Sequence, residues 1–378
     1  MQEPEAKAVE PLCDFAAATS RRCTASLLGR LREQAYRTVE TVVAPASRCA
    51  LLGYPDHTNP GDHAVWLGAR SVLERLRAEI IYECSWRDYS REALAAAVDA
   101  GAQIVFTGGG NFGDVWPATH ALRERVLHDF KGTRMVQLQQ TVHFRRTDNL
   151  ARTRKLLERH GNVVLVVRDR LSLDLVRRSF DVDVRLGPDL AFACTLEAPT
   201  EAPAADIAWI AREDRESPDR DPHPTPGGVW RVDWNLRENE LRPLEGEAPL
   251  SSAVHELINR NQSMTKTAAL GDSGRDHSRD LAQVREQLTH RRLERGCRLL
   301  RRGRVIVTDS LHAHTVGLML GIPTVVTDNN YGKLRGTFET FTHAAPLARW
   351  AETPEAALAL AGRWLQASAG DCAGGVDQ

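Results

Sequence analysis

The chain has 378 residues, of which 49 are basic and 50 are acidic, so its formal net charge is −1. At roughly 100–200 residues per domain, this length favours two domains over one. A hydrophobic share of 42% with 26% charged residues is typical of a globular protein and argues against extensive disorder. The near-neutral charge argues against a broad basic surface, so we expect no nucleic-acid partner. A local basic pocket for a small anion remains compatible with it.

The compartment is predicted from what the sequence lacks. Residues 1–15 are acidic and have no apolar core of signal-peptide length. No run approaches the roughly 18 apolar residues of a membrane span. The seven cysteines have no CxxC spacing, which argues against a disulfide framework and a zinc knuckle. We therefore expect a cytoplasmic protein with free thiols.

The first half of the chain alternates short strands with helices. Residues 1–45 are predicted as a lead-in with a helix at 25–43, where apolar residues have helical spacing. A domain then runs from 46 to 200. Its predicted strands are 49–53, 80–82, 103–107, 134–139, 163–167 and 182–186, and its helices are 63–78, 91–100, 121–130, 149–160 and 171–179. This alternation is typical of βαβ units in a parallel sheet.

A second α/β domain is predicted for 201–345, followed by a C-terminal helix and tail at 346–378. Its strands are expected at 207–210, 227–234, 305–308 and 324–327, and its helices at 281–302 and 313–320. The polar stretches 213–228, 236–250 and 260–280 are predicted as loops. The helix at 281–302 carries seven arginines. It is either a peripheral membrane contact or a solvated face paired with acidic neighbours.

Polar residues follow strands in both halves, at 107–111 and at 308–312. In open parallel sheets, ligands bind outside the carboxyl ends of the strands. Two such edges that face each other would form a cleft between the domains.

Two motifs in the first half suit a small anion. Asn59, Gly61 and Asp62 precede a predicted helix, whose N-terminus attracts negative charge. Alternatively, Asp62 simply caps that helix. Three glycines at 108–110 precede Asn111 and indicate the close approach of a ligand or of another chain segment, or alternatively a tight turn. Their order matches neither common nucleotide-binding loop.

Charged and titratable residues follow three further strands. His143 is either structural or catalytic. Arg168 directly follows strand 163–167, where its guanidinium could bind phosphate or carboxylate oxygens. His312 and His314 could act as acid and base near neutral pH. Metal binding is disfavoured, because no carboxylate or third histidine has suitable spacing.

Lys333 and Arg335 follow the last predicted strand of the second half. They place positive charge near the two histidines in sequence. Alternatively, they belong to a solvated basic turn.

Taken together, the motif-bearing stretches resemble the polysaccharide pyruvyltransferase family, especially the bacterial exopolysaccharide pyruvyltransferases. The matching stretches keep the family's order and are 53–62, 108–114, 137–144, 167–172, 188–192, 209–216 and 311–341. The resemblance implies two Rossmann-like domains facing a central cleft, in a GT-B-like arrangement. It also implies transfer of a pyruvyl group from phosphoenolpyruvate to a sugar, which forms a ketal. The donor is then a substrate, and no cofactor or metal is expected.

The resemblance also implies roles for individual residues. Arg168 would bind the donor, and His143 and His312 would transfer protons. The remaining candidate binding residues are Asn59, Gly61, Asp62 and Asn111 in the first domain, with Ser310, His314, Asn330, Lys333 and Arg335 in the second.

Ser310 departs from the family pattern, in which an arginine often precedes Leu-His. Lys333, Arg335 or Arg212 would have to supply the missing charge, or the donor differs. The stretch 236–280 has no counterpart in the family pattern. Two alternatives therefore stay open: a GT-B-like glycosyltransferase that uses a nucleotide-sugar, and an inactive carbohydrate-binding relative. The acceptor would be a sugar of a polysaccharide or of its lipid-linked precursor.

Overall fold

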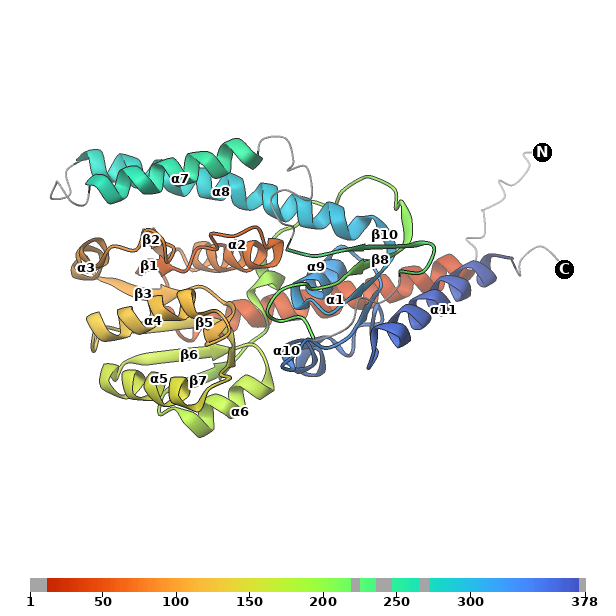
Figure 1. Cartoon of the computed structure of the whole chain (residues 1–378), viewed down its shortest axis with the longest axis horizontal. Coiled ribbons are helices and arrows are strands. Elements are labelled where there is room, and N and C mark those ends of the chain that lie inside the picture. The colour runs from red at the N-terminus through yellow and green to blue at the C-terminus, as the bar shows by residue number, and fades with distance from the viewer. Residues whose placement is uncertain (1–11, 219–224, 236–246, 265–271, 374–378) are drawn as a thin grey trace, which may run out of the picture.

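The protein is an α/β molecule with two parallel β-sheets (Figure 1). The structure is a computed structural model and describes residues 12–218, 225–235, 247–264 and 272–373. Within these ranges the first sheet has seven strands, in the order β2-β1-β3-β5-β6-β7 with β4 beside β5. The second has five, in the order β12-β11-β10-β8-β9. The predicted α/β class with parallel strands is confirmed.

The first sheet occupies the part of the chain where alternating strands and helices were predicted. Its strands are β1 (Arg48–Leu52), β2 (Glu79–Cys84), β3 (Ala102–Phe106), β4 (Gly109–Gly113), β5 (Met135–His143), β6 (Val163–Val167) and β7 (Asp183–Leu186). The helices are α2 (Pro60–Arg75), α3 (Arg91–Asp99), α4 (Pro117–Asp129), α5 (Thr147–His160) and α6 (Arg170–Ser179), with a 3₁₀ turn η1 (Leu190–Ala193).

The second sheet follows, and the long helix α1 (Leu12–Glu40) precedes both. The strands are β8 (Ala205–Ile210), β9 (Val229–Val232), β10 (Gly303–Thr308), β11 (Thr324–Val326) and β12 (Ala348–Trp350). The helices are α7 (Glu247–Met264), α8 (Asp272–Arg301), α9 (Leu311–Met319), α10 (Lys333–Thr337) and α11 (Pro354–Ala373), with a π turn η2 (Phe338–Thr342). The edge strand β12 lies beyond residue 345. The predicted domain boundaries stay a prediction.

The loops predicted at 236–250 and 260–280 were wrong where the structure describes them. Helices α7 and α8 cover 247–264 and 272–301, while 236–246 and 265–271 lie outside the described residues. Val254 and Ile258 of α7 pack against Leu281 and Leu288 of α8 in a small core of their own. A few apolar residues at helical spacing suffice when another helix covers them, and such packing is not visible in local periodicity.

The glycine-rich segment closely approaches another part of the chain, as one of the sequence predictions had it. Gly109 to Gly113 form strand β4 rather than a turn, and it pairs in parallel with the end of β5. Strand β5 therefore continues to His143. A Cβ added to Gly113 would overlap the carbonyl oxygen of His143, so the close strand approach explains this glycine.

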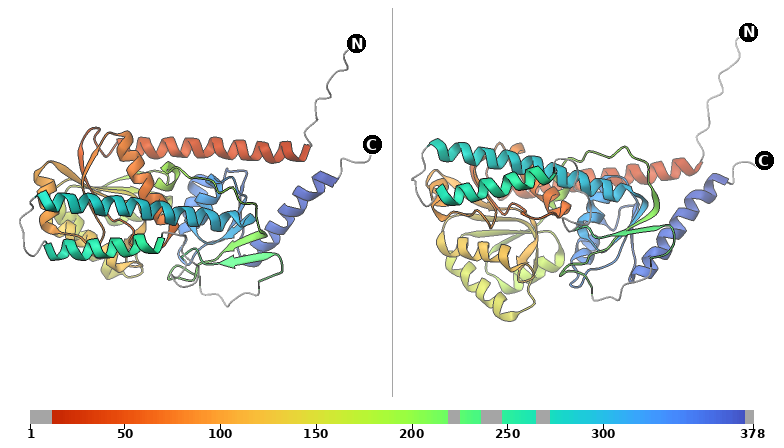
Figure 2. Two further views of the ribbon diagram at one scale, coloured as in Figure 1. Left: turned by 90° about the horizontal axis from the view of Figure 1, so that it is seen from above. Right: turned by 45° about the horizontal axis from the view of Figure 1, so that its top comes forward.

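A continuous hydrophobic core joins the two halves. It contains Trp66 of α2 and Val105 of β3 together with Trp234, Leu300 and Ile306 of the second half. Helix α8 contributes to this joint: it packs along α2, and its C-terminal part reaches β10 (Figures 1 and 2). A second apolar cluster covers the other face of the first sheet, under α3, α4, α5 and α6.

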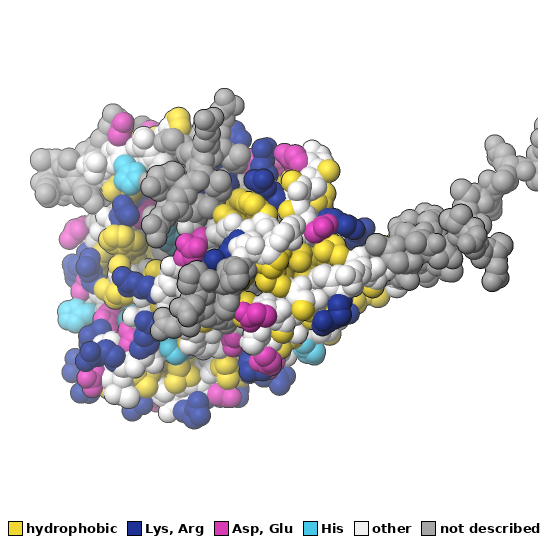
Figure 3. Space-filling view, turned by 45° about the vertical axis from the view of Figure 1, so that its right-hand side comes forward, with side chains coloured by type: hydrophobic (Ala, Val, Ile, Leu, Met, Phe, Trp, Pro, Cys, Tyr) yellow, Lys and Arg dark blue, Asp and Glu magenta, His cyan; other side chains and the backbone are white. Residues whose placement is uncertain are grey.

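The surface agrees with the near-neutral charge. On the face shown in Figure 3, the described basic side chains lie among acidic and hydrophobic ones. Arg285, Arg292 and Arg295 of α8, which belong to the predicted basic helix, are buried against the first half. In the part of the chain that the structure describes, no helix combines the length and the apolar character needed to cross a membrane.

The contact between α2 and η1 generates a stability prediction. A Cβ on Gly68 would overlap the backbone carbonyl of Leu190, whereas one on Gly29 of α1 would meet nothing within 4 Å. We expect Gly68→Ala to lower the free energy of unfolding by about 1–3 kcal/mol through overpacking. Gly29→Ala, the matched control, should leave it unchanged or raise it by up to about 1 kcal/mol. Urea unfolding measures both, and equal midpoints for the two variants would contradict the packing described.

Candidate active site

A buried arginine lies where the two halves meet. Arg168 follows β6, and its side chain has no solvent exposure. Its Nε donates to Thr141 Oγ1 at 2.9 Å, and its Nη1 pairs with the buried carboxylate of Asp189. The same Nη1 lies 3.1 Å from Nε2 of His312, at the start of α9. The first half therefore fixes the guanidinium, and the second half presents a histidine to it.

The third nitrogen of this guanidinium is Nη2. Nη2 is buried, and it donates to no hydrogen-bond acceptor among the described residues. A Cβ added to Gly110 would lie 2.9 Å from this nitrogen and 2.5 Å from Nζ of Lys333. Two cations thus face one point beside the backbone of β4, where only glycine leaves room. A buried donor without an acceptor costs about 1–3 kcal/mol, which a bound anion would recover.

Lys333 is held by a buried carboxylate. Its Nζ donates to Glu216 Oε2 at 3.0 Å and to Oε1 at 3.2 Å. Glu216 also accepts from Trp116 Nε1 at 2.9 Å, which links the second half to the first. Burial raises the pKa of Glu216, but the nearby Arg212 and Lys333 outweigh it, and the net pKa is lowered. The carboxylate is therefore ionised at neutral pH.

His312 lies between charges of both signs. Its Nε2 is 3.5 Å from Asp189 Oδ2, and its Nδ1 is 3.9 Å from Asp62 Oδ1. The same Nε2 is 3.1 Å from Nη1 of Arg168. A Cβ on Gly61 would overlap the ring of His312. The glycine thus allows the first turn of α2, with Asp62, to approach the histidine closely.

His143 lies in a second region, an open cleft of about 610 Å³. Its ring is half-buried and stacks on Tyr331, with 4.5 Å between ring centroids. Burial lowers the pKa of His143. The lining residues come from both halves and are His143, Arg145, Asp214, Arg215, Ser217, Asn330 and Tyr331. Tyr331 and Glu216 interact electrostatically, so this cleft adjoins the buried cations.

Several predicted residues support the site without facing it. Asn59 is the N-cap of α2, so the alternative cap role of Asp62 was wrong: Asn59 Oδ1 accepts from Gly61 N at 2.9 Å. Asn111 is held by Arg123 and by Gln140. Ser310 is buried at the start of α9, and its backbone N–H donates to Thr308 Oγ1 at 2.9 Å.

Two predicted residues are not brought to the site. His314 is fully buried, and its ring nitrogens contact Thr324 Oγ1 at 2.8 Å and Thr342 Oγ1 at 2.9 Å. Arg335 is at the surface and binds Glu339 and Glu352. His314 follows His312 by two positions in α9, and Arg335 follows Lys333 by two positions in α10. A step of two residues is more than half a turn of an α-helix, so His314 and Arg335 point away from the site that His312 and Lys333 face.

Lys333, Arg335 and Arg212 were the candidates to supply the positive charge that an arginine at position 310 would carry. Lys333 is adjacent to Arg168. Arg212 is instead engaged by Asp214, at 3.0 Å from Nε to Oδ1, and by Glu216, at 3.5 Å from Nη1 to Oε2. Burial lowers the pKa of Arg212, but these carboxylates outweigh it and raise the pKa. Only Lys333 of the three faces the free nitrogen of Arg168.

Asp189 and Glu216 were not among the predicted site residues. Both fall within stretches that resemble the family, 188–192 and 209–216, and this was the available signal. Burial raises the pKa of Asp189, but Arg168 and His312 outweigh it, so the net pKa is lowered. The described residues include no cluster of three or more potential metal ligands among His, Cys, Asp and Glu.

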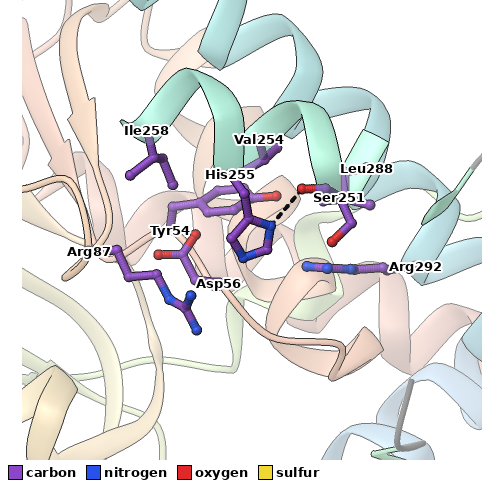
Figure 4. A pocket seen from close by; sticks show the side chains of 9 residues that line it. All are labelled: Tyr54, Asp56, Arg87, Ser251, Val254, His255, Ile258, Leu288 and Arg292. Carbon is purple, nitrogen blue, oxygen red and sulfur yellow. Dashed lines mark hydrogen bonds between the residues drawn. The ribbon is translucent and has the colours of Figure 1, made fainter. Parts of the chain in front are cut away.

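A small cavity lies beneath α7 and is separate from this site (Figure 4). Its volume is about 20 Å³, and its lining includes Tyr54, Asp56, His255 and Arg292. His255 Nδ1 contacts Ser251 O at 2.8 Å, as the dashed line in Figure 4 marks. This volume suits about one water molecule and no larger ligand.

Comparison with known proteins identifies relatives along most of the chain. The family model described as "Polysaccharide pyruvyl transferase" matches residues 59–331. The chain is 29% identical over 315 residues to pyruvyl transferase 1 of Schizosaccharomyces pombe, covering 80% of this chain and 72% of that protein. It is 23% identical over 310 residues to the EpsO protein of Bacillus subtilis, provisionally named a pyruvyl transferase, covering 82% and 89%.

A solved structure of a functionally uncharacterised protein from Klebsiella pneumoniae is also similar. It is 15% identical, with a TM-score of 0.49, and the match covers 81% of this chain and 94% of that one.

The burial of His314 generates a pH prediction. Burial lowers its pKa to about 3, compared with about 6.5 for an exposed histidine. Between these values the folded state binds fewer protons at this position than the unfolded state does. The neutral, buried His314 therefore contributes fully to stability above about pH 6.5, and this contribution is lost as the pH falls toward about 3. We expect His314→Gln, which does not titrate, to lose less stability than the parent between about pH 7 and about pH 4. Urea unfolding at both values tests this, and an equal loss in both proteins would contradict it.

Proposed function

The chain belongs to the polysaccharide pyruvyl transferase family, and on this basis we propose that it transfers a pyruvyl group from phosphoenolpyruvate to a sugar and forms a ketal across two hydroxyls. The acceptor is a sugar of a polysaccharide or of its precursor. The donor binds between the two halves, which act as Rossmann-like domains around one cleft.

The pair of cations at Gly110 carries this proposal. Phosphoenolpyruvate has a phosphate and a carboxylate, and both bind well to guanidinium and ammonium groups. The free Nη2 of Arg168 and the Nζ of Lys333 face the same point. A small anion placed there would satisfy the buried donor. This arrangement assigns to Lys333 the charge that Ser310 lacks.

His312 is the proposed acid. It donates a proton to the methylene carbon C3 of the donor, which becomes a methyl group and leaves C2 as an oxocarbenium ion. A sugar hydroxyl then attacks C2, and Asp62, 3.9 Å from the imidazole, receives its proton. The bond between C2 and the phosphate oxygen breaks, and phosphate leaves with the electron pair. A second hydroxyl closes the ketal. Asp62 passes the first hydroxyl proton to His312, and the second hydroxyl proton goes to the phosphate.

The cleft beside His143 and Tyr331 is the proposed acceptor site. It combines an aromatic pair with polar side chains from both halves, including Asn330 and Ser217. Binding sites for organic ligands commonly combine apolar or aromatic surface with a few placed polar groups. Tyr331 joins this cleft to the buried cations, which is the arrangement that transfer from a donor to an acceptor requires.

The transfer itself is tested by incubating the protein with phosphoenolpyruvate and candidate glycans. Mass spectrometry should detect the added pyruvyl ketal, and a phosphate assay should detect equal amounts of released phosphate. Calorimetry with nucleotide-sugars distinguishes the glycosyltransferase alternative. Binding of a nucleotide-sugar without binding of phosphoenolpyruvate would refute the proposed donor.

The donor site generates a prediction with a matched control. Lys333→Met and Arg168→Lys each remove a charge-assisted hydrogen bond, worth about 1.5–3 kcal/mol, and should weaken phosphoenolpyruvate binding by roughly 10–150-fold. Arg335→Ala removes a cation two positions away that is bound to Glu339 and Glu352 at the surface. It should leave the affinity unchanged. Calorimetry measures all three, and equal losses for Lys333→Met and Arg335→Ala would refute the assignment.

The role of His312 generates a second prediction. Loss of a general acid typically costs about 10²–10⁴-fold in rate. We expect His312→Asn to lower kcat by that order, whereas the exposed His343→Asn should leave kcat unchanged. Steady-state phosphate release measures both. A normal kcat for His312→Asn, with an intact fold by circular dichroism, would exclude His312 as the acid.

A further inference from the structure

Lysine is rare in this chain, so a lysine rather than an arginine beside Arg168 indicates a specific requirement at that position. Of the 49 basic residues, five are lysines, namely Lys7, Lys131, Lys155, Lys266 and Lys333. Among the described residues, Lys131 and Lys155 are exposed, whereas Lys333 is buried. Burial readily changes the pKa of an ammonium group, whereas a guanidinium keeps its charge. A buried lysine beside an arginine thus needs a further group to keep it protonated.

Glu216 has the geometry to do this. Its carboxylate is 2% exposed and contacts Lys333 Nζ through both oxygens, at 3.0 and 3.2 Å. The contacts from Trp116 Nε1 at 2.9 Å and Asn329 Nδ2 at 3.3 Å fix the carboxylate in place. Asn329 also accepts from the backbone N–H of Lys333 at 2.9 Å. The carboxylate and the start of α10 are therefore held in one network.

We propose that Glu216 is a positioning residue that keeps Lys333 protonated and directed at Gly110, and so sets the upper pH limit of donor binding. The link to donor binding rests on the proposed function, whereas the control of the charge on Lys333 by Glu216 does not.

The charges around Lys333 explain why Glu216 is needed. Four charged groups act on the ammonium of Lys333: Glu216, Arg168, Arg212 and Asp62. The titratable groups next to these are His312 of α9, which contacts Arg168, and Tyr331, which lies beside Glu216. Asp169, at the start of α6, faces Gly336 of α10. Burial is the largest effect on the pKa of Lys333, Glu216 is the largest opposing effect, and the net pKa is lowered. Without Glu216, two arginines would act against Asp62 alone. Lys333 would then lose its proton at a lower pH.

The contact with Trp116 allows charge and structure to be separated. Glu216→Gln removes the charge but keeps an oxygen that can accept from the indole. Trp116→Phe removes the indole donor but keeps the carboxylate. A purely structural role of Glu216 predicts similar effects of the two variants, whereas control of charge predicts a titration shift in Glu216→Gln and none in Trp116→Phe.

The titration of Lys333 can be followed directly by NMR with isotope-labelled lysine, because the chain has five lysines. Lys333→Arg identifies the signal by its loss. We expect Glu216→Gln to lower the titration midpoint of Lys333 by about one pH unit or more, as removal of a close opposite charge does. Glu216→Asp, with the carboxylate drawn back by one methylene, should give an intermediate midpoint. Glu216→Asp therefore still tests the proposal if Glu216→Gln does not fold.

Trp116→Phe and Glu339→Gln, an exposed acidic position, are the controls and should keep the parental midpoint. An unchanged midpoint in Glu216→Asp and in any folded Glu216→Gln protein would overturn the proposal.

The KM for phosphoenolpyruvate, measured against pH, provides the second measurement. A midpoint lowered by one unit should raise this KM about tenfold at alkaline pH in Glu216→Gln and leave it near the parental value at lower pH. If the midpoint falls but the parent does not bind phosphoenolpyruvate, the proposed function fails and the role of Glu216 in setting the charge of Lys333 stands. If the parent binds phosphoenolpyruvate but the midpoint does not move, the role of Glu216 fails alone.

Discussion

The buried ion pair between Arg168 and Asp189 is the constraint on which the rest of the site depends. A guanidinium without solvent contact is costly unless it is paired and hydrogen-bonded, and Asp189 and Thr141 meet that need from one side. This requirement fixes the end of β6 against η1. It also leaves one nitrogen of Arg168 facing Gly110. The pair thus stabilises the contact of β6 with η1, and it orients the Nη2 of Arg168, which has no acceptor among the described residues.

The second half of the chain completes this arrangement rather than adding a separate site. His312 reaches Arg168 because Gly61 lets α9 and the first turn of α2 approach each other. Glu216 reaches Lys333 from the loop after β8 and holds Trp116 of the first half with the same carboxylate. The shared hydrophobic core around Trp66 and Trp234 holds the two halves together, and so holds His312 against Arg168 and Glu216 against Trp116. Each cation of the site therefore depends on groups from distant parts of the chain.

The parts predictable from sequence were those with local causes. Apolar runs such as 163–167 predicted the strands, and residues after strand ends predicted Arg168 and His312. The ion pair of Lys333 with Glu216 could not be predicted, because its members are 117 positions apart and meet only in the folded chain. His314 and Arg335 point away from the cations although they are close in sequence to His312 and Lys333, because two positions along a helix turn a side chain by more than half a turn. Helix α7 was missed because its apolar residues are few and are covered by α8.

The near-zero net charge has a counterpart inside the site. Arg168 is matched by Asp189, Lys333 by Glu216 and Arg212 by Asp214. A ligand therefore meets neutralised pairs rather than a strong positive field. What remains to hold an anion is directional: the free N–H group of Arg168 and the ammonium protons of Lys333 that Glu216 does not use. Because buried pairs of this kind tolerate neither the loss of a partner nor a shift in position, the same carboxylates that cancel the charge also determine where an anion can bind.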